Sequence, residues 1–196
     1  MSVAESDTIR MADENTQSLD AMFDAFEGLP VLEGMRIEVV EGNVHMTPQR
    51  ATHWEIIWKI VTQLTNRFPQ RRVFSDVRID YPGDHNGLCS DVTLLAEGAQ
   101  ADDEGRWRWQ DVEFVAEVIS RGTGMNDYGP KKTAYATAGV PLYLIADPYQ
   151  GSVHVYAQPK SGDYAETWPP VPFGTDIDLT QTPLGLTLGT ADSPRD

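Results

Sequence analysis

Two acidic residues lie in stretches of sequence that otherwise have the pattern of buried strands. Asp91 is near the start of the apolar run 90–96, and Glu117 lies inside a second apolar run, 112–119. Burying a carboxylate is unfavourable unless a cation or a hydrogen-bond donor compensates it. Lys131 follows at the start of a predicted short helix. Two carboxylates on adjacent strands beside a lysine can hold Mg²⁺ and orient a water molecule against a phosphodiester.

The rest of the sequence predicts an α/β domain with a mixed sheet. Pro130 suits a first helical position and Gly139 suits the position just beyond a helix end, which predicts a helix over residues 131–138. The continuous apolar run 142–146 is typical of a strand covered on both faces. Apolar residues at helical spacing predict another helix over 19–26. The other predicted strands are 36–40, 43–46, 73–79, 152–156 and 164–168, and a turn-rich loop is predicted over 81–87.

Residues 52–68 have the pattern of a long amphipathic helix. Thr52 and Glu55 match a capping box, in which each side chain accepts a hydrogen bond from the other residue's backbone N–H. The apolar residues of this segment form one stripe, so the helix is predicted to pack on a sheet. The stripe consists of Trp54, Ile57, Trp58, Val61, Leu64 and Phe68.

The composition indicates a folded single domain. The 196 residues are 40% hydrophobic and include five tryptophans, which is enough apolar surface for a core. Cys89 is the only cysteine, which excludes an intramolecular disulfide and argues against a cysteine-based zinc site. No secretory signal pattern is present, and no apolar run approaches the roughly 20 residues that span a bilayer. We therefore expect a cytoplasmic protein with a disordered acidic leader (1–17), a nuclease-like folded domain (18–190) and a tail (191–196).

The formal net charge of −15 is difficult to reconcile with binding to a nucleic acid. Proteins that bind a polyanion normally present a basic surface. The acidic excess is uneven, however, because residues 1–33 carry eight acidic side chains against one basic, whereas residues 36–72 carry six basic against three acidic. A local basic face is compatible with this distribution. Generic, tight DNA binding at physiological salt is not expected.

Several further side chains have both a functional and a structural interpretation. His53 lies at a predicted helix start, where support of a cap is favoured over a role in catalysis. Asp127 is predicted to cap the helix that carries Lys131 rather than to bind metal. Trp107 and Trp109 occupy alternate positions in an acidic loop. Stacking on an unpaired base is one interpretation of these tryptophans, and a dimer contact or local packing is the favoured one.

Short motifs occur in a fixed order along the chain, namely 38–42, His53, 117–120, Asp127, Lys131, Tyr135 and 138–148. In this order and spacing they resemble the bacterial "putative restriction endonuclease" family, which is part of the PD-(D/E)XK nuclease superfamily. The similarity covers about residues 19–190, nearly the whole chain. It implies a restriction-endonuclease-like α/β fold, in which helices flank a mixed central sheet.

The resemblance also implies a function and a set of site residues. Asp91 and Glu117 would be ligands of Mg²⁺, with Mn²⁺ as a substitute, and the backbone carbonyl of Val118 would be a third ligand. Lys131 would be the displaced lysine of the superfamily motif and would orient the attacking water. Glu38 would be an additional acidic catalytic residue. The expected protein is a homodimeric endonuclease that acts on DNA and does not associate with membranes.

Two positions depart from the family pattern. Ser90 stands where proline is usual, which changes backbone stiffness but no ligand, and Arg121-Gly122 interrupts the usual loop after the second acidic residue. Tyr135 lies four residues after Lys131 on the same helical face and is expected to fix the position of the lysine. The structural alternatives are a solvated Lys131 and a Glu38 that is only a solvated strand residue or a salt-bridge partner.

Two other functions stay open at this point. Paired carboxylates also perform acid–base hydrolysis of glycosides, although that chemistry leaves Lys131 unexplained. A catalytically inactive, acidic and dimeric interaction module on the same fold is the other alternative. The charge of −15 favours this module more than any single residue does.

Overall fold

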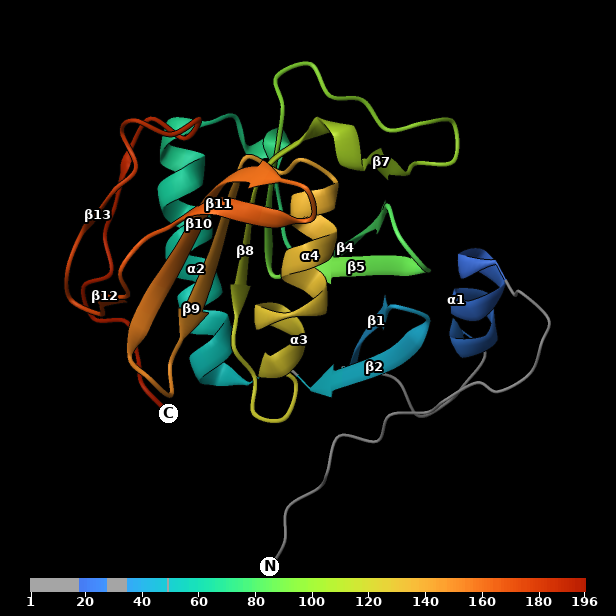
Figure 1. The fold of residues 1–196 in the computed structure, drawn as a ribbon, viewed down its shortest axis with the longest axis horizontal. Coiled ribbons are helices and arrows are strands. Elements are labelled where there is room, and N and C mark those ends of the chain that lie inside the picture. Colours follow the sequence, from blue (N-terminus) through green and yellow to red (C-terminus); the bar gives the residue numbers. More distant parts are fainter. Residues whose placement is uncertain (1–17, 28–34, 49) are drawn as a thin grey trace, which may run out of the picture.

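A computed structural model describes residues 18–27, 35–48 and 50–196 and confirms the predicted α/β architecture with mixed sheets (Figure 1). The predicted leader, 1–17, lies outside the described residues. Among the described residues, no helix is long and apolar enough to cross a lipid bilayer. The α-helices are α1 (Leu19–Glu27), α2 (Ala51–Arg67), α3 (Gly124–Tyr128) and α4 (Pro130–Thr137).

The larger sheet has the strand order β11-β10-β9-β8-β6-β3, with β12 beside β10. Neighbouring strands are antiparallel except β8 and β9, which are parallel. Parallel neighbours need a crossover connection, and α3 with α4 supplies it. These strands are β3 (Val73–Phe74), β6 (Val92–Leu95), β8 (Val112–Val118), β9 (Leu142–Asp147), β10 (Ser152–Lys160), β11 (Asp163–Thr167) and β12 (Val171–Pro172).

The smaller sheet has the strand order β2-β1-β5-β4-β7. The chain passes several times between the two sheets, and between β5 of this sheet and β6 of the larger one a single residue, Asp91, makes the connection. The end of β5 in the smaller sheet therefore lies next to Asp91. Its strands are β1 (Met35–Val40), β2 (Asn43–Pro48), β4 (Val77–Tyr81), β5 (Asn86–Ser90) and β7 (Trp107–Arg108).

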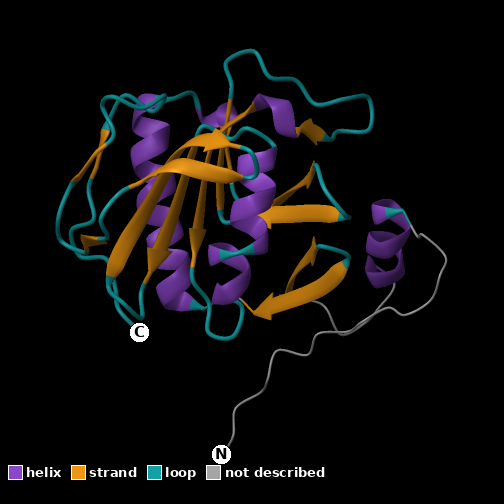
Figure 2. Ribbon diagram, in the orientation of Figure 1, coloured by secondary structure: helices purple, strands orange, loops and turns teal. Residues whose placement is uncertain are grey.

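Two hydrophobic clusters cover the two faces of the larger sheet. On one face, α2 and the C-terminal segment pack against alternate residues of the strands, such as Phe114 and Leu144. On the other face, α4 and the smaller sheet pack against the intervening residues, such as Val115 and Ile145. Figure 2 shows the two helices α2 and α4 beside this sheet. Every residue of β9 is buried, which confirms that the apolar run 142–146 is a strand covered on both faces.

The predicted strand 73–79 is wrong, because the segment divides between the two sheets. Its first two residues form β3 and its last three belong to β4, with Asp76 in a left-handed conformation (φ 57°) between them. The turn-rich segment 81–87 is shorter than predicted, since β5 already begins at Asn86. The alternation of apolar and polar residues over 73–79 correctly indicated strands. It does not indicate that the chain leaves one sheet and enters the other within this segment.

The predicted start and the predicted buried stripe of α2 also need correction. The helix begins at Ala51, and its N-cap residue, Arg50, makes no side-chain capping hydrogen bond, so the capping box is absent. Trp54 and Trp58 are 47% and 57% exposed and pack against each other at a centroid distance of 6.2 Å. Successive helical residues differ by about 100° in direction, so the sheet contacts only a narrow face. That face consists of His53, Ile56, Ile57, Ile60 and Leu64.

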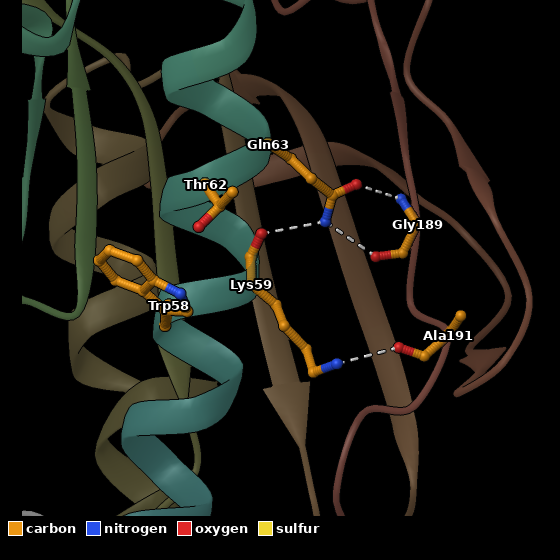
Figure 3. A pocket seen from close by; sticks show the side chains of 6 residues that line it. All are labelled: Trp58, Lys59, Thr62, Gln63, Gly189 and Ala191. Atoms are coloured by element: carbon orange, nitrogen blue, oxygen red, sulfur yellow. Dashed lines mark hydrogen bonds between the residues drawn. The ribbon is translucent and has the colours of Figure 1, made fainter.

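The C-terminal segment is tied to the outer side of α2. The Gln63 side chain accepts a hydrogen bond from the Gly189 N–H at 2.7 Å and donates one to the Gly189 carbonyl at 3.0 Å. Lys59 Nζ donates to the Ala191 carbonyl at 3.3 Å, and these residues line a pocket of about 380 Å³ (Figure 3). A two-stranded ribbon of β13 (Ile177–Asp178) and β14 (Thr187–Leu188) precedes this contact and adds Ile177 and Leu188 to the core.

The two faces of α2 predict opposite responses to mutation. Ile57 is fully buried, so Ile57→Ala should lower the free energy of unfolding by about 2–5 kcal/mol through the cavity it leaves. Trp58→Ala should change it by less than about 1 kcal/mol, because the side chain is largely exposed. Urea denaturation of the two variants checks this, and a larger loss for Trp58→Ala would contradict the packing described.

Candidate active site

Asp91 and Glu117 lie side by side where the two sheets meet. The antiparallel register pairs Val92 of β6 with Ala116 of β8, so the next pair along is Asp91 and Glu117. The backbone N–H of Asp91 donates to Glu117 Oε2 at 3.4 Å. Both carboxylates are fully buried. The two acidic residues singled out from the sequence are therefore neighbours in space.

Asp91 is held by donors from three separate segments. Arg36 of β1 forms an ion pair with Asp91 Oδ1. The Val118 N–H donates to Oδ2 at 2.6 Å, and His53 Nε2 of α2 lies 3.3 Å from the same oxygen. Sequence reasoning missed Arg36. Its signal was the alternation of β1, which places Arg36 and Glu38 on one face of the strand.

Glu117 contacts two residues of α4. Lys131 Nζ lies 2.7 Å from Glu117 Oε1, and the Tyr135 O–H donates to the same oxygen at 2.5 Å. Lys131 and Tyr135 are four residues apart and share a helical face, as predicted. Tyr135, however, contacts the carboxylate rather than the lysine, so both side chains converge on Glu117. Lys131 is 2% exposed and is not a solvated helix residue.

Glu38 belongs to the same cluster. Its carboxylate lies 3.1 Å from Lys131 Nζ and accepts a hydrogen bond from the Cys89 N–H at 3.0 Å. It also lies 3.7 Å from Arg36 Nε. Because Glu38 is 5% exposed, it is a buried ion-pair partner rather than a solvated strand residue.

The predicted capping role of Asp127 is wrong. The N-cap residue of α4 is Gly129, and no side chain caps it. Asp127 instead lies in the short helix α3, is buried, and contacts Lys131 Nζ at 3.1 Å. A lysine in the first turn of a helix opposes the helix dipole, so surrounding carboxylates compensate it better than solvent does. Asp127 is therefore the third carboxylate around Lys131.

His53 also has a different environment from the one predicted. The residue lies in the first turn of α2 but turns inward, and Nε2 lies 2.8 Å from the Val118 carbonyl oxygen. A carbonyl oxygen only accepts hydrogen bonds, so Nε2 carries the proton. The buried Nδ1 has no hydrogen-bond partner among the described residues. His53 thus fixes the carbonyl that the resemblance assigns as the third metal ligand.

The buried cluster contains more carboxyl groups than cations. Four buried carboxyl groups face only two permanently charged basic side chains, Arg36 and Lys131. Burial, together with the negative charges of neighbouring carboxylates, raises the pKa of Glu117 well above its ordinary value and that of Asp127 to about 6. Protons on these two groups compensate the excess negative charge. The four carboxyl groups are those of Glu38, Asp91, Glu117 and Asp127.

The other groups of the cluster stay charged. Burial opposes ionisation of Asp91 and Glu38, but the charges of Arg36 and Lys131 hold both pKa values below their ordinary range. Burial also opposes the charge on Lys131, yet Glu117, Glu38 and Asp127 together raise the pKa of its ammonium group well above normal. The lysine is a fixed positive charge and cannot serve as a free base near neutral pH.

The donor chemistry of this cluster fits Mg²⁺, which prefers carboxylate and carbonyl oxygens. The two surplus carboxyl groups also suit a divalent cation, which would replace their protons. In the part of the chain that the structure describes, however, no three acidic, histidine or cysteine side chains converge at metal-binding distances. Arg36 and Lys131 occupy the carboxylate oxygens instead. Asp91 and Glu117 are the residues that would hold the ion, once these contacts loosen.

A family model described as "putative restriction endonuclease" matches residues 23–191. The chain belongs to this family. The match spans both sheets and every residue of the buried cluster. A comparison with curated protein sequences gives no match. The expected family resemblance is therefore confirmed, and it supports a nuclease function.

A solved structure from Anabaena variabilis is similar in fold to this family member. It is described as a putative nuclease belonging to DUF820, and it superposes with a TM-score of 0.66 at 17% sequence identity. The superposition covers 89% of this chain and 95% of the other. The predicted restriction-endonuclease-like fold class is thereby confirmed.

The raised pKa of Asp127 predicts a stability that falls as the pH rises. The folded protein keeps a proton on Asp127 up to about pH 6, whereas an unfolded aspartate loses it near 3.8. The metal-free protein should therefore lose about 2 kcal/mol of unfolding free energy between pH 4 and pH 6 through this group. Urea denaturation in a chelator at several pH values measures the loss.

Asp127→Asn should remove most of this pH dependence, because asparagine does not ionise. The exposed Asp103→Asn is the matched control and should follow the wild type. Parallel pH profiles for Asp127→Asn and the wild type would contradict the assigned cause.

His53 offers a test of how the cluster is held. His53→Ala removes the side-chain donor to the Val118 carbonyl and one of the donors around Asp91, and should lower the free energy of unfolding by about 1–3 kcal/mol. His53→Gln keeps an N–H donor and should restore part of that loss. Thermal and urea unfolding compare the two variants, and equal stability of His53→Ala and wild type would exclude this role.

Proposed function

We propose that the protein is a Mg²⁺-dependent nuclease that hydrolyses phosphodiester bonds of DNA. One observation carries the proposal. Asp91 and Glu117 form a buried pair, and Glu117 contacts Lys131 directly. The family membership and the shared fold support it. The choice of DNA rests on the family description, and Mn²⁺ is proposed as a substitute ion.

Asp91 and Glu117 would bind the metal ion, and Glu38 would complete the acidic group around Lys131. A bound Mg²⁺ would polarise the scissile phosphate and lower the pKa of a water molecule. Lys131 is a fixed positive charge, so its role is to orient the attacking water and stabilise negative charge in the transition state. Tyr135 and His53 are positioning residues, because they hold Glu117 and the segment beside Asp91.

The buried position of the site sets a condition on catalysis. Asp91 and Glu117 are fully buried, so a phosphodiester reaches them only after covering side chains move. Arg36 contacts Asp91 and is itself largely buried. Displacement of Arg36 by the metal ion would free a carboxylate oxygen and place a cation beside the incoming phosphate.

We further propose a cytoplasmic homodimer, because residues 18–27, 35–48 and 50–196 include no separate element that reads DNA sequence. Two copies acting together would supply a longer contact with the duplex. The proposed location rests on the single cysteine of the chain, which suits a reducing compartment.

One observation favours a second function, a catalytically inactive interaction module on the same fold. The cations of the cluster already pair with its carboxylates, and the chain has a net charge of −15. A cluster that has lost metal binding would keep these ion pairs as structural contacts. The two functions differ in whether the protein binds Mg²⁺.

Calorimetric titration with Mg²⁺ distinguishes them. Wild-type protein should bind the ion, and both Asp91→Asn and Glu117→Gln should abolish binding while keeping the side-chain shape. The exposed Glu55→Gln is the matched control and should bind like the wild type. Equal heats in all four proteins, or no heat in a folded wild type, would reject the assigned metal site.

Cleavage assays on duplex and single-stranded DNA test the catalytic step. Lys131→Gln should reduce the rate by about 100- to 1,000-fold, because a positive charge near the developing anion is lost. Circular dichroism confirms that the variant is folded. Unchanged cleavage by Lys131→Gln would remove the lysine from the mechanism.

A further inference from the structure

A second concave site lies between β4 and the loop that precedes β8. It is a pocket of about 550 Å³, distinct in its residues from the buried carboxylate cluster. Three arginines and two tryptophans line it, which is an unusual concentration in a chain with a net charge of −15. These residues are Arg78, Arg106, Trp107, Arg108 and Trp109, and Asp80 and Asp102 line the pocket beside them.

Two of the arginines converge on one carboxylate. Asp20 of α1 accepts a hydrogen bond from Arg78 Nη2 at 2.9 Å and another from Arg106 Nη1 at 3.0 Å. These three side chains are 24–47% exposed, so the contact lies at the surface. Two guanidinium groups directed at one anion are the arrangement that proteins use to bind a phosphate. Arg78 also pairs with Asp80 at 2.7 Å and Arg106 with Glu104 at 3.1 Å. Asp20 lies between the two guanidinium groups, in the position of an anionic ligand.

The helix that carries Asp20 docks through few contacts. Phe23 lies under the Arg78 guanidinium at 4.0 Å and contacts Gly87 of β5, where a Cβ atom would come within 2.6 Å of the ring. Met22 and Phe26 add a small apolar contact. A nine-residue helix is marginal in water without such packing. An external anion would therefore compete with the Asp20 carboxylate, whose helix is weakly held, for Arg78 and Arg106.

The tryptophans give this pocket a second kind of contact. Trp107 packs on Phe74 at a centroid distance of 5.0 Å, and both Trp107 and Trp109 are partly exposed. Partly exposed aromatic rings beside arginines can stack with an unpaired base while the arginines contact its phosphate. A double-stranded segment keeps its bases stacked on one another and does not offer them to such a pocket.

We propose that this pocket binds an unpaired nucleotide of a nucleic acid strand, with the phosphate between Arg78 and Arg106 in place of the Asp20 carboxylate and the base against the tryptophans. The site rests on the proposed nuclease function for its biological use, but its binding chemistry does not depend on cleavage. Asp20 acts as an internal competitor and weakens binding by the full chain.

The test uses the complete protein in a chelator, so that metal-dependent cleavage does not consume the probe. The probe is a fluorescein-labelled oligothymidylate of about eight nucleotides, within the range of single-strand binding sites, and anisotropy reports binding. Asp20→Asn should tighten binding by about tenfold, because the charged competitor is lost. Asp24→Asn, an exposed residue on the same helix, is the matched control and should bind like the wild type.

A second pair of variants tests the arginines. In the Asp20→Asn background, Arg106→Ala should weaken binding by about tenfold and lower the slope of log affinity against log salt by about 0.7, as expected for one lost phosphate contact. Arg71→Ala, an exposed arginine outside the pocket, should leave both quantities unchanged. Quenching of tryptophan fluorescence by the oligonucleotide reports stacking.

Each outcome has a distinct meaning. Equal affinity of Asp20→Asn and wild type, or equal effects of Arg106→Ala and Arg71→Ala, would overturn the proposal. Tighter binding to a duplex than to the oligothymidylate would also overturn it. If the protein fails to cleave DNA with Mg²⁺ but shows the predicted pattern of binding, the pocket stands and only the catalytic proposal fails.

Discussion

The carboxylate of Asp91 links the two sheets. The backbone crosses from β5 to β6 at this residue, while its side chain pairs with Arg36 on β1 and accepts the N–H of Val118 on β8. An apolar residue would bury equally well but would leave that N–H without an acceptor and would remove one carboxylate partner of the Arg36 guanidinium. The same link sets the position of Glu117, because the register between β6 and β8 continues through it. The carboxylate of Asp91 therefore both joins the two sheets and forms part of the site.

Stability alone does not account for the composition of this cluster. Well-packed apolar residues of similar volume often stabilise a protein as much as a buried ion pair does, whereas removal of one partner costs about 3–5 kcal/mol. A cluster with two surplus carboxyl groups is less favourable still, since burial raises the pKa of Glu117 and of Asp127 and so opposes their ionisation. A purely structural cluster needs no such surplus. The imbalance favours a role in which a cation enters.

The sequence predicted the parts of the fold that depend on local pattern. The buried strand β9, the helix α4 and the positions of Asp91 and Glu117 follow from apolar runs and from Pro130 and Gly139, which are visible along the chain. The points at which the chain leaves one sheet and enters the other could not be predicted from the sequence. Asp76 in its left-handed conformation separates β3 from β4, but strand alternation is the same whichever sheet a segment joins.

The missed members of the site share one cause. Arg36 and Asp127 contact partners that lie 55 residues and 4 residues away, and in neither case does the local sequence identify the partner. Arg36 lies in an alternating strand, where each residue faces one side, but the pattern does not say which side is buried. Asp127 precedes Gly129 and Pro130, so a cap was the natural local interpretation. In the fold, Asp127 instead contacts the buried Lys131 ammonium group at 3.1 Å.

The distribution of arginines bears on how an acidic protein can bind an anion. Arg36 pairs with Asp91, Arg72 with Glu113, Arg78 with Asp20, and Arg108 with Asp111. An incoming phosphate therefore exchanges one anionic partner for another, and the net free energy of binding is the difference between the two. Net charge governs the long-range approach of a ligand, whereas this exchange governs affinity at contact. At the pocket beside β4, binding of a phosphate therefore depends on the departure of the Asp20 carboxylate more than on the total charge of the chain.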